Sequence, residues 1–179
     1  MLMTLLAALA LEAATSRTEI TPKFMNGVHM ACEAAFDVVV QDTAYNQGKP
    51  VTVAGSFGLY NWPDKSRVFV AMKLGVSLEG MNYMPPTNAY VLNGYKTNLA
   101  EQLAQSDAEL QGFRLFVFNV SGEQTLEALW RIATTNELNV AYTLRGGTMP
   151  QTFPVIFTPE NGEDWRECLS ALVNRDVPA

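Results

Sequence analysis

The sequence predicts an α+β protein with a single two-layer domain over residues 1–179. The expected parts are a mainly antiparallel sheet of about 5–6 strands, an N-terminal helical pair and three further helices. Three observations support this prediction. Apolar residues have helical spacing over 1–41, they alternate strictly within 50–79, and the order strand, helix, strand, strand, helix follows over 113–175. The chain is long enough to bury a core of its own.

The helical pair is expected over residues 1–41. Residues 2–15 are apolar nearly throughout, which favours a buried helix, although a run of this kind is also typical of a secretory signal peptide. No Lys or Arg precedes the run, and we therefore favour the helix. A second helix is expected from Thr21, as its N-cap, with Pro22 at the first helical position, to about Gln41.

The most regular alternation lies within residues 50–79, which are expected to form a long β-hairpin. In the second half of this segment apolar residues occupy every second position, so one face belongs to the core and the other is partly solvated. The alternating apolar residues are Val68, Val70, Met72, Leu74, Val76 and Leu78. Pro63 and Asp64 are expected at the centre of the turn between the two strands.

The segment after the hairpin is rich in Met, Tyr, Asn and Pro, and it is expected to be an extended loop with a short strand at Tyr90–Leu92. Asn98 and Glu101 have the spacing of a capping box. A helix, or two short ones, is therefore expected over residues 98–111.

Residues 113–175 are expected to form a β-α-β-β-α unit. Its first helix is expected over 123–136, a hairpin is expected across Gly146 and Gly147, and Asn161 is expected to cap the last helix. In each helix the apolar stripe should face the core. The expected inward residues are Leu126, Leu129, Trp130 and Ala133 in the first helix, and Trp165, Cys168, Leu169, Leu172 and Val173 in the last.

The composition points to contacts with other proteins. Charged residues make up 17% of the chain, below the usual level of about 25%, and the surface should therefore be unusually neutral. Surfaces poor in Lys and Glu are typical of protein contact areas. The net charge of −6 and the absence of a basic cluster argue against nucleic acid or an anionic membrane as the main partner.

The stretch NGVHMACEAAF contains the only histidine and one of the two cysteines. On the helix expected here, His29 shares a polar stripe with Glu33, while Cys32 faces the apolar side, so no Cys–His nucleophile is formed. His29, Glu33 and Asp37 share one face, but three ligands from one straight helix cannot surround a metal ion. Cys32 and Cys168 would pair only if the fold brought them together.

No other motif predicts catalysis. Ser56 in VAGSFG is similar to a nucleophile elbow, but a strand and a turn are expected after it, and the histidine lies upstream. Glu160, Glu163 and Asp164 cluster at a helix start, where carboxylates favour the helix dipole. The sequence therefore predicts no catalytic, cofactor-binding or metal-ligating residue and no cofactor.

The remaining feature is a set of aromatic and Met residues in the expected loops. Such side chains suit protein contacts because they offer a large contact area, although they could instead fold back over the sheet. The residues of this predicted interaction surface are Tyr60, Trp62, Met81, Tyr83, Met84, Tyr90 and Tyr95.

These observations favour a soluble, non-enzymatic assembly or protein-interaction subunit of a homo-oligomer or larger complex, such as a virion or secretion-apparatus component. The alternatives are a small enzyme with carboxylate, Tyr and Ser side chains on loops, and a small-ligand-binding domain. The expected partner is the chain itself or another protein, with no nucleic acid and no membrane span. The expected location is the cytoplasm, a virion or a complex, or outside the cell if residues 1–14 act as a signal peptide.

Overall fold

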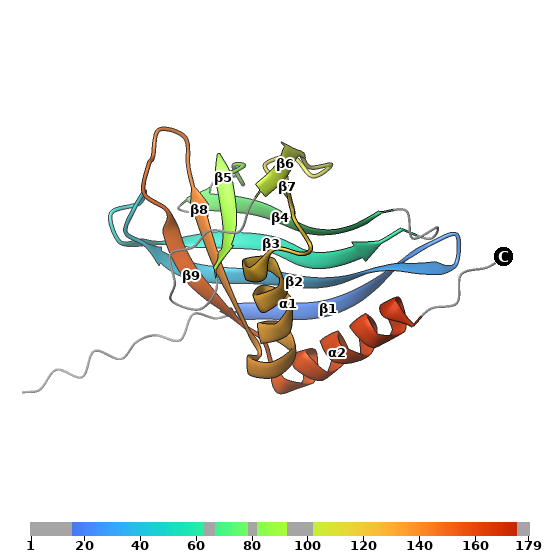
Figure 1. Ribbon diagram of the computed structural model, residues 1–179. Coiled ribbons are helices and arrows are strands. Elements are labelled where there is room, and N and C mark those ends of the chain that lie inside the picture. The colour runs from blue at the N-terminus through green and yellow to red at the C-terminus, as the bar shows by residue number, and fades with distance from the viewer. Residues whose placement is uncertain (1–15, 63–66, 79–81, 93–101, 175–179) are drawn as a thin grey trace, which may run out of the picture.

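The computed structural model of the protein describes residues 16–62, 67–78, 82–92 and 102–174. Within these ranges it contains nine strands and two helices, so the protein is mainly β and the predicted α+β class is wrong. Six strands form one antiparallel sheet in the order β1-β2-β3-β4-β7-β6 (Figure 1). Their bounds are β1 Ser16–Met25, β2 Val28–Asp42, β3 Lys49–Asn61, β4 Val68–Leu78, β6 Gln102–Asp107 and β7 Arg114–Phe118.

A second, three-stranded antiparallel sheet and both helices come from the later part of the chain. The strand order of this sheet is β5-β8-β9. The bounds are β5 Asn88–Leu92, β8 Glu137–Thr143, β9 Gln151–Ile156, α1 Glu123–Thr135 and α2 Pro159–Val173. No helix in the described ranges is long and apolar enough to span a membrane.

The predicted N-terminal helical pair is wrong wherever the structure describes it. Residues 16–42 form the β1–β2 hairpin, and the part of the prediction over residues 2–15 lies outside the described residues. Asn26 and Gly27 have φ angles of 50° and 81°, as a two-residue type I′ turn requires. The alanines of β2 favour a helix locally, but β2 pairs with a strand on each side, and this pairing outweighs their propensity.

The predicted helix over residues 98–111 is also wrong in its described part. Gln102–Asp107 forms β6, which pairs with β7 at the end of the large sheet, and residues 93–101 lie outside the described residues. The capping-box residues Asn98 and Glu101 are among those outside the described residues, and the pairing of β6 with β7 outweighs any local helical preference of the segment. The expected turn at Pro63 and Asp64 lies outside the described residues as well.

Several other elements form close to where they were expected. β3 and β4 pair in an antiparallel register, with Phe57 opposite Met72. β8 and β9 pair across the Gly146–Gly147 turn, and α1 and α2 begin within a few residues of the predicted starts. Thr158, rather than Asn161, is the N-cap of α2, and Asn161 completes the capping box from the N3 position.

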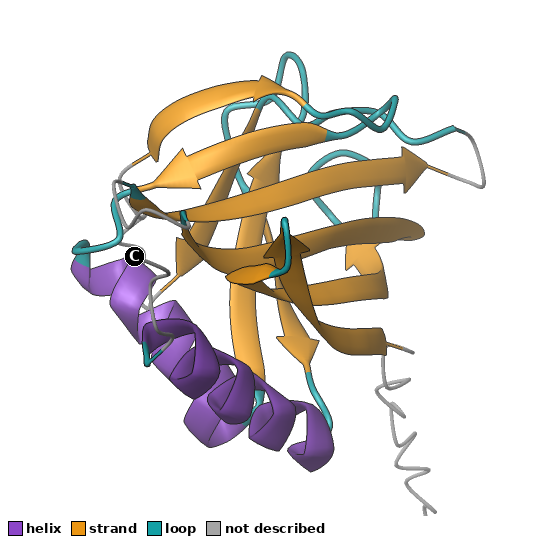
Figure 2. Ribbon diagram, turned by 90° about the vertical axis from the view of Figure 1, so that its right-hand side faces the viewer, coloured by secondary structure: helices purple, strands orange, loops and turns teal. Residues whose placement is uncertain are grey.

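The core lies between the large sheet and a second layer made of the small sheet and the helices. Figure 2 shows the large sheet curving around one side of the molecule, with both helices together at one corner. The inner face of the large sheet contributes fully buried apolar side chains at every second position. Examples are Cys32, Ala34, Val53, Phe57, Val70, Met72, Leu74 and Val76, which meet Val140, Tyr142, Val155, Trp165 and Leu172 from the second layer.

A disulfide joins the two layers and answers the question that the sequence left open. Cys32 lies on the inner face of β2, and Cys168 lies on the buried face of α2, which packs against β1 and β2 (Figure 1). Cys168 was expected to face the core, and it is buried. The bond therefore fixes the C-terminal helix to the N-terminal hairpin.

Candidate functional site

The structure separates the residues of the predicted interaction surface. Met81 and Tyr95 lie outside the described residues. Tyr60 lies beside Phe69 of β4, whereas Met84 pairs with Val76 at the other end of the same strand. The two ends are separated by the seven residue steps from 69 to 76, or about 23 Å at about 3.3 Å per residue. Tyr60 and Met84 therefore lie near opposite ends of β4.

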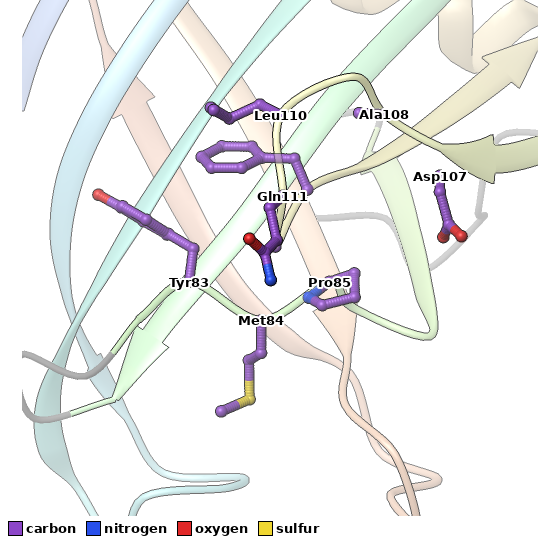
Figure 3. A pocket seen from close by; sticks show the side chains of 9 residues that line it. Tyr83, Met84, Pro85, Asp107, Ala108, Leu110 and Gln111 are labelled. Atoms are coloured by element: carbon purple, nitrogen blue, oxygen red, sulfur yellow. The ribbon is translucent and has the colours of Figure 1, made fainter.

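Tyr83 and Met84 line a surface depression of about 410 Å³. It lies between residues 83–85 and the β6–β7 connection, and Figure 3 shows Gln111 between Tyr83 and Pro85, with Asp107 on the far side. The other lining residues are Ala108, Leu110, Gly112 and Phe113.

Ring stacking and close backbone contact hold this depression in shape. The Tyr83 ring centroid lies 4.9 Å from that of Phe113, and burial raises the pKa of the Tyr83 hydroxyl. Gly112 has a φ of +86°, and an added Cβ there would lie 2.2 Å from the Tyr83 carbonyl oxygen. Only glycine fits at this position.

The ionisable side chains in the described lining of the depression are those of Tyr83 and Asp107. Asp107 is exposed, and its carboxylate lies 3.4 Å from the Arg114 guanidinium. Among the described lining residues, no Ser, Cys, Lys or His stands beside this carboxylate to act with it as a nucleophile and base. Leu110 is exposed at the rim, and β6 beside it is exposed along almost its whole length.

Tyr60 is engaged inside the protein rather than offered to a partner. Its hydroxyl donates a hydrogen bond to Glu33 on the neighbouring strand, and its ring stacks on Phe69 with centroids 5.0 Å apart. Burial, and secondarily the hydrogen bond to Glu33, raise the pKa of the Tyr60 hydroxyl well above its usual range. Glu33 also pairs with Lys23 at 3.4 Å. Because β2 is extended, His29 and Glu33 do not share the helical stripe expected for them.

Trp62 and Tyr90 lie apart from each other and from the Tyr83 depression. Trp62 follows β3 and lines an open depression of about 490 Å³ with Arg67, Val68, Phe69 and Val117. Tyr90 lies within β5 and is half-buried. Arg67 is the one charged residue beside Trp62 in the described lining of that depression.

An exposed apolar group with a groove beside it lies on α1, and sequence reasoning missed it. Leu126 and Trp130 were expected to face the core, but they are 50% and 65% exposed. The inward face of α1 carries Leu129 and Ala133, as expected, together with Thr125, Ala128 and Ile132. The helix is therefore rotated relative to the prediction.

A shallow groove runs from this exposed face to α2. Its volume is about 350 Å³, and its lining is almost entirely apolar. The lining residues are Leu126, Leu129, Trp130, Ala133, Thr134, Arg166 and Leu169. Arg166 donates a hydrogen bond to the Ala133 carbonyl and so connects the two helices beneath the groove.

The remaining candidates from the sequence do not form a catalytic centre. Ser56 lies within β3, opposite Ala35 and Lys73, and no helix follows it, so the nucleophile elbow is absent at this position. Glu163 lies in the first turns of α2 and is 3.9 Å from Arg166. These acids belong to an exposed helix surface, as expected for carboxylates near a helix start.

Asp42 is the one charged residue in the described ranges that is fully buried. One of its carboxylate oxygens accepts a hydrogen bond from the Tyr142 hydroxyl, and the other accepts one from the Tyr45 backbone N–H at 2.6 Å. Nearby, the Gln151 side chain accepts hydrogen bonds from the Thr43 N–H at 3.0 Å and the Ala44 N–H at 3.3 Å. The network joins the β2–β3 turn to the small sheet, and satisfied buried groups of this kind are ordinary structural features.

His29 lies against the disulfide. Its Nε2 atom is 3.6 Å from Cys32 Sγ and 3.5 Å from Cys168 Sγ. His29 and Cys32 were expected on different faces of a helix. In the structure both lie near the hairpin end of β2, and the His29 ring contacts the sulfur of Cys32.

The chain matches no protein-family model, no curated protein and no solved structure. Its function is therefore inferred from the surfaces and side-chain clusters described above.

Proposed function

We propose that the protein is a non-enzymatic assembly subunit of a homo-oligomer, and that it associates through the groove between α1 and α2. The observation that supports this proposal is the exposure of Trp130 and Leu126 beside an apolar groove. Trp is the residue type most enriched among those that dominate binding energy at protein interfaces. Exposed apolar area next to a groove is typical of a contact site.

The edge of the large sheet supports the same class of function. β1, at one end of the sheet, carries Arg17, Glu19 and Lys23 as well as Pro22, which are residues that discourage pairing with another strand. β6, at the other end, has no charge or proline from Gln102 to Ser106. β6 and the neighbouring Leu110 therefore form a second area suited to contact with another chain.

The proposal is tested by measuring molar mass by light scattering over a wide range of protein concentration. The wild-type chain should form an oligomer, and Trp130→Ala should weaken association at least about tenfold, because buried interface Trp residues commonly contribute about 2 kcal/mol or more. Leu126→Gln should act in the same direction.

Met149→Gln is the control, because Met149 is an apolar residue that is even more exposed, at 75%, but lies in the connection between β8 and β9, away from α1. A wild-type chain that stays monomeric at every concentration would contradict the proposal. So would association that is unchanged in Trp130→Ala and Leu126→Gln.

A further inference from the structure

The cluster of His29, Cys32 and Cys168 has the donor set of a metal site. The nitrogen and the two sulfurs all lie within 4.8 Å of one another. Two of the residues come from β2 and the third from α2, so the cluster spans the contact between the large sheet and the C-terminal helix. Thiolate and imidazole are the ligands that Zn²⁺ prefers in proteins.

The position of the imidazole agrees with the geometry of a zinc ion. Zn–S bonds of about 2.3 Å and Zn–N bonds of about 2.0 Å in a tetrahedral arrangement place nitrogen and sulfur about 3.5 Å apart. His29 Nε2 lies 3.6 Å from Cys32 Sγ and 3.5 Å from Cys168 Sγ. The imidazole nitrogen of the disulfide form therefore lies at zinc-like distances from both sulfurs, and on reduction the sulfurs must separate from each other while staying about 3.5 Å from Nε2.

The sulfurs can reach their positions without movement of the backbone. The Cα atoms of Cys32 and Cys168 are 5.9 Å apart. Two thiolates on one tetrahedral ion lie about 3.8 Å apart, and rotation of either cysteine by one rotamer about its Cα–Cβ bond moves its sulfur by about 3 Å, which is enough to open the bonded pair to that separation. Reduction of the disulfide is thus the only covalent change that the site requires.

We propose that the dithiol form of the protein binds one Zn²⁺ through His29 Nε2, Cys32 Sγ and Cys168 Sγ. A dithiol reductant first transfers two electrons and two protons to the disulfide, and the reductant itself becomes a disulfide. Zinc then replaces the two thiol protons, which are released to solvent. The two thiolate charges balance the charge of the ion, and water takes the fourth position.

The histidine changes its hydrogen bonding when the ion binds. In the disulfide form, Nε2–H donates to the Ala31 carbonyl oxygen at 3.0 Å. In the zinc form, Nε2 carries the lone pair that binds the metal, and the proton resides on Nδ1. The Phe24 ring stacks on the imidazole with centroids 5.1 Å apart, and this contact holds the ring plane toward the sulfurs in both forms.

Burial determines how the ion reaches the site and what it does there. Cys32 and Cys168 are buried, whereas His29 is only partly buried, so the ion approaches from the histidine side. Bound zinc would join α2 to β2, as the disulfide does in the oxidised chain. The protein would then keep this connection in both redox states. This inference is independent of the proposed assembly function.

The test compares the oxidised chain with the chain reduced by a dithiol, freed of reductant and kept without oxygen. Titration with Zn²⁺, and with Co²⁺ as a spectroscopic probe, should show one ion per reduced chain, together with a thiolate-to-cobalt charge-transfer band. The oxidised chain should show neither. His29→Gln should weaken binding at least tenfold, and Cys168→Ser should remove the two-thiolate spectrum.

Asp37→Asn is the matched control, because Asp37 lies on β2 but on the exposed face of the strand. It should bind zinc as the wild type does. Circular dichroism of each reduced chain, before and after zinc, separates loss of fold from loss of ligand, since zinc should restore any structure lost on reduction. Absence of binding by the reduced wild type, folded or unfolded, would overturn the proposal, as would unchanged affinity in His29→Gln.

Discussion

At the residue scale, the Asp42–Tyr142 pair shows how this protein places polar groups in its core. Tyr142 is fully buried, and its hydroxyl donates to the buried Asp42 carboxylate, which also accepts the Tyr45 N–H. The pair connects the end of β2 to β8, so it joins the two sheets. A buried carboxylate that loses one of its partners is costly, because it cannot recover that hydrogen bond from water.

The same pair predicts a loss of stability in alkaline solution. Burial, and then the hydrogen bond to Asp42, raise the pKa of the Tyr142 hydroxyl far above its usual value of 10.0. Because the folded-state pKa is raised, this stabilisation is fully present below pH 10. It is lost as the pH rises further, at about 1.4 kcal/mol per pH unit for one tyrosine.

The measurement is urea unfolding of the wild type and Tyr142→Phe between pH 8 and 11. At pH 8 the variant should be less stable by about 1–3 kcal/mol, because Asp42 loses a hydrogen bond. Above pH 10 its stability should fall less steeply than that of the wild type. Tyr90→Phe, which lies outside this hydrogen-bond network, is the control. Equal alkaline slopes in the wild type and Tyr142→Phe would contradict the assigned role of Tyr142.

At the element scale, β2 shows why the sequence of the N-terminal hairpin also fits a helix. Its even-numbered positions from Cys32 to Val40 are all apolar, while the charged residues Glu33 and Asp37 fall on odd positions, as a half-buried strand requires. The same residues also fit an apolar helical arc. The Asn26-Gly27 pair distinguishes the two patterns, because it is a strong signal for a two-residue hairpin turn.

Elements with strict alternation could be predicted, and elements with mixed patterns could not. β4 has an unbroken apolar face, so its strand was visible in the sequence. In α1 two apolar stripes compete, and the chain buries the one that contains Ile132 and leaves the one with Trp130 exposed. That choice depends on the packing of α1 against β5, β8 and α2, which no local pattern contains.

The β1–β2 turn gives a prediction at this scale. Gly27 has a φ of +81°, and a Cβ added there would meet no atom of the described chain within 4 Å. Gly27→Ala should therefore destabilise the protein by about 1–2 kcal/mol through backbone strain alone. Gly27→Asn should lose less, because Asn tolerates the left-handed region. The check is the urea midpoint of both variants, and equal losses would contradict strain as the cause.

At the scale of the whole molecule, the Cys32–Cys168 disulfide joins parts of the chain that are far apart in sequence. The two cysteines are separated by 136 residues, so the bond encloses most of the described protein in one covalent loop. The sequence could not predict this pairing, nor the contact of His29 with both sulfurs. Both depend on how α2 returns to the β1–β2 hairpin, which is a property of the assembled fold (Figure 1).

A loop of this length makes a definite prediction for stability. Closing it restricts the unfolded chain, and reduction of the bond should lower the free energy of unfolding by about 2–5 kcal/mol. The measurement is urea unfolding with and without a dithiol reductant, in the presence of a chelator so that zinc cannot replace the disulfide. The Cys32→Ala/Cys168→Ala double variant should have the stability of the reduced wild type and no response to the reductant. A wild-type chain whose stability is the same in both redox states would show that α2 is held by packing alone, chiefly by the buried Trp165, whose indole N–H donates to the Leu129 carbonyl at 3.1 Å.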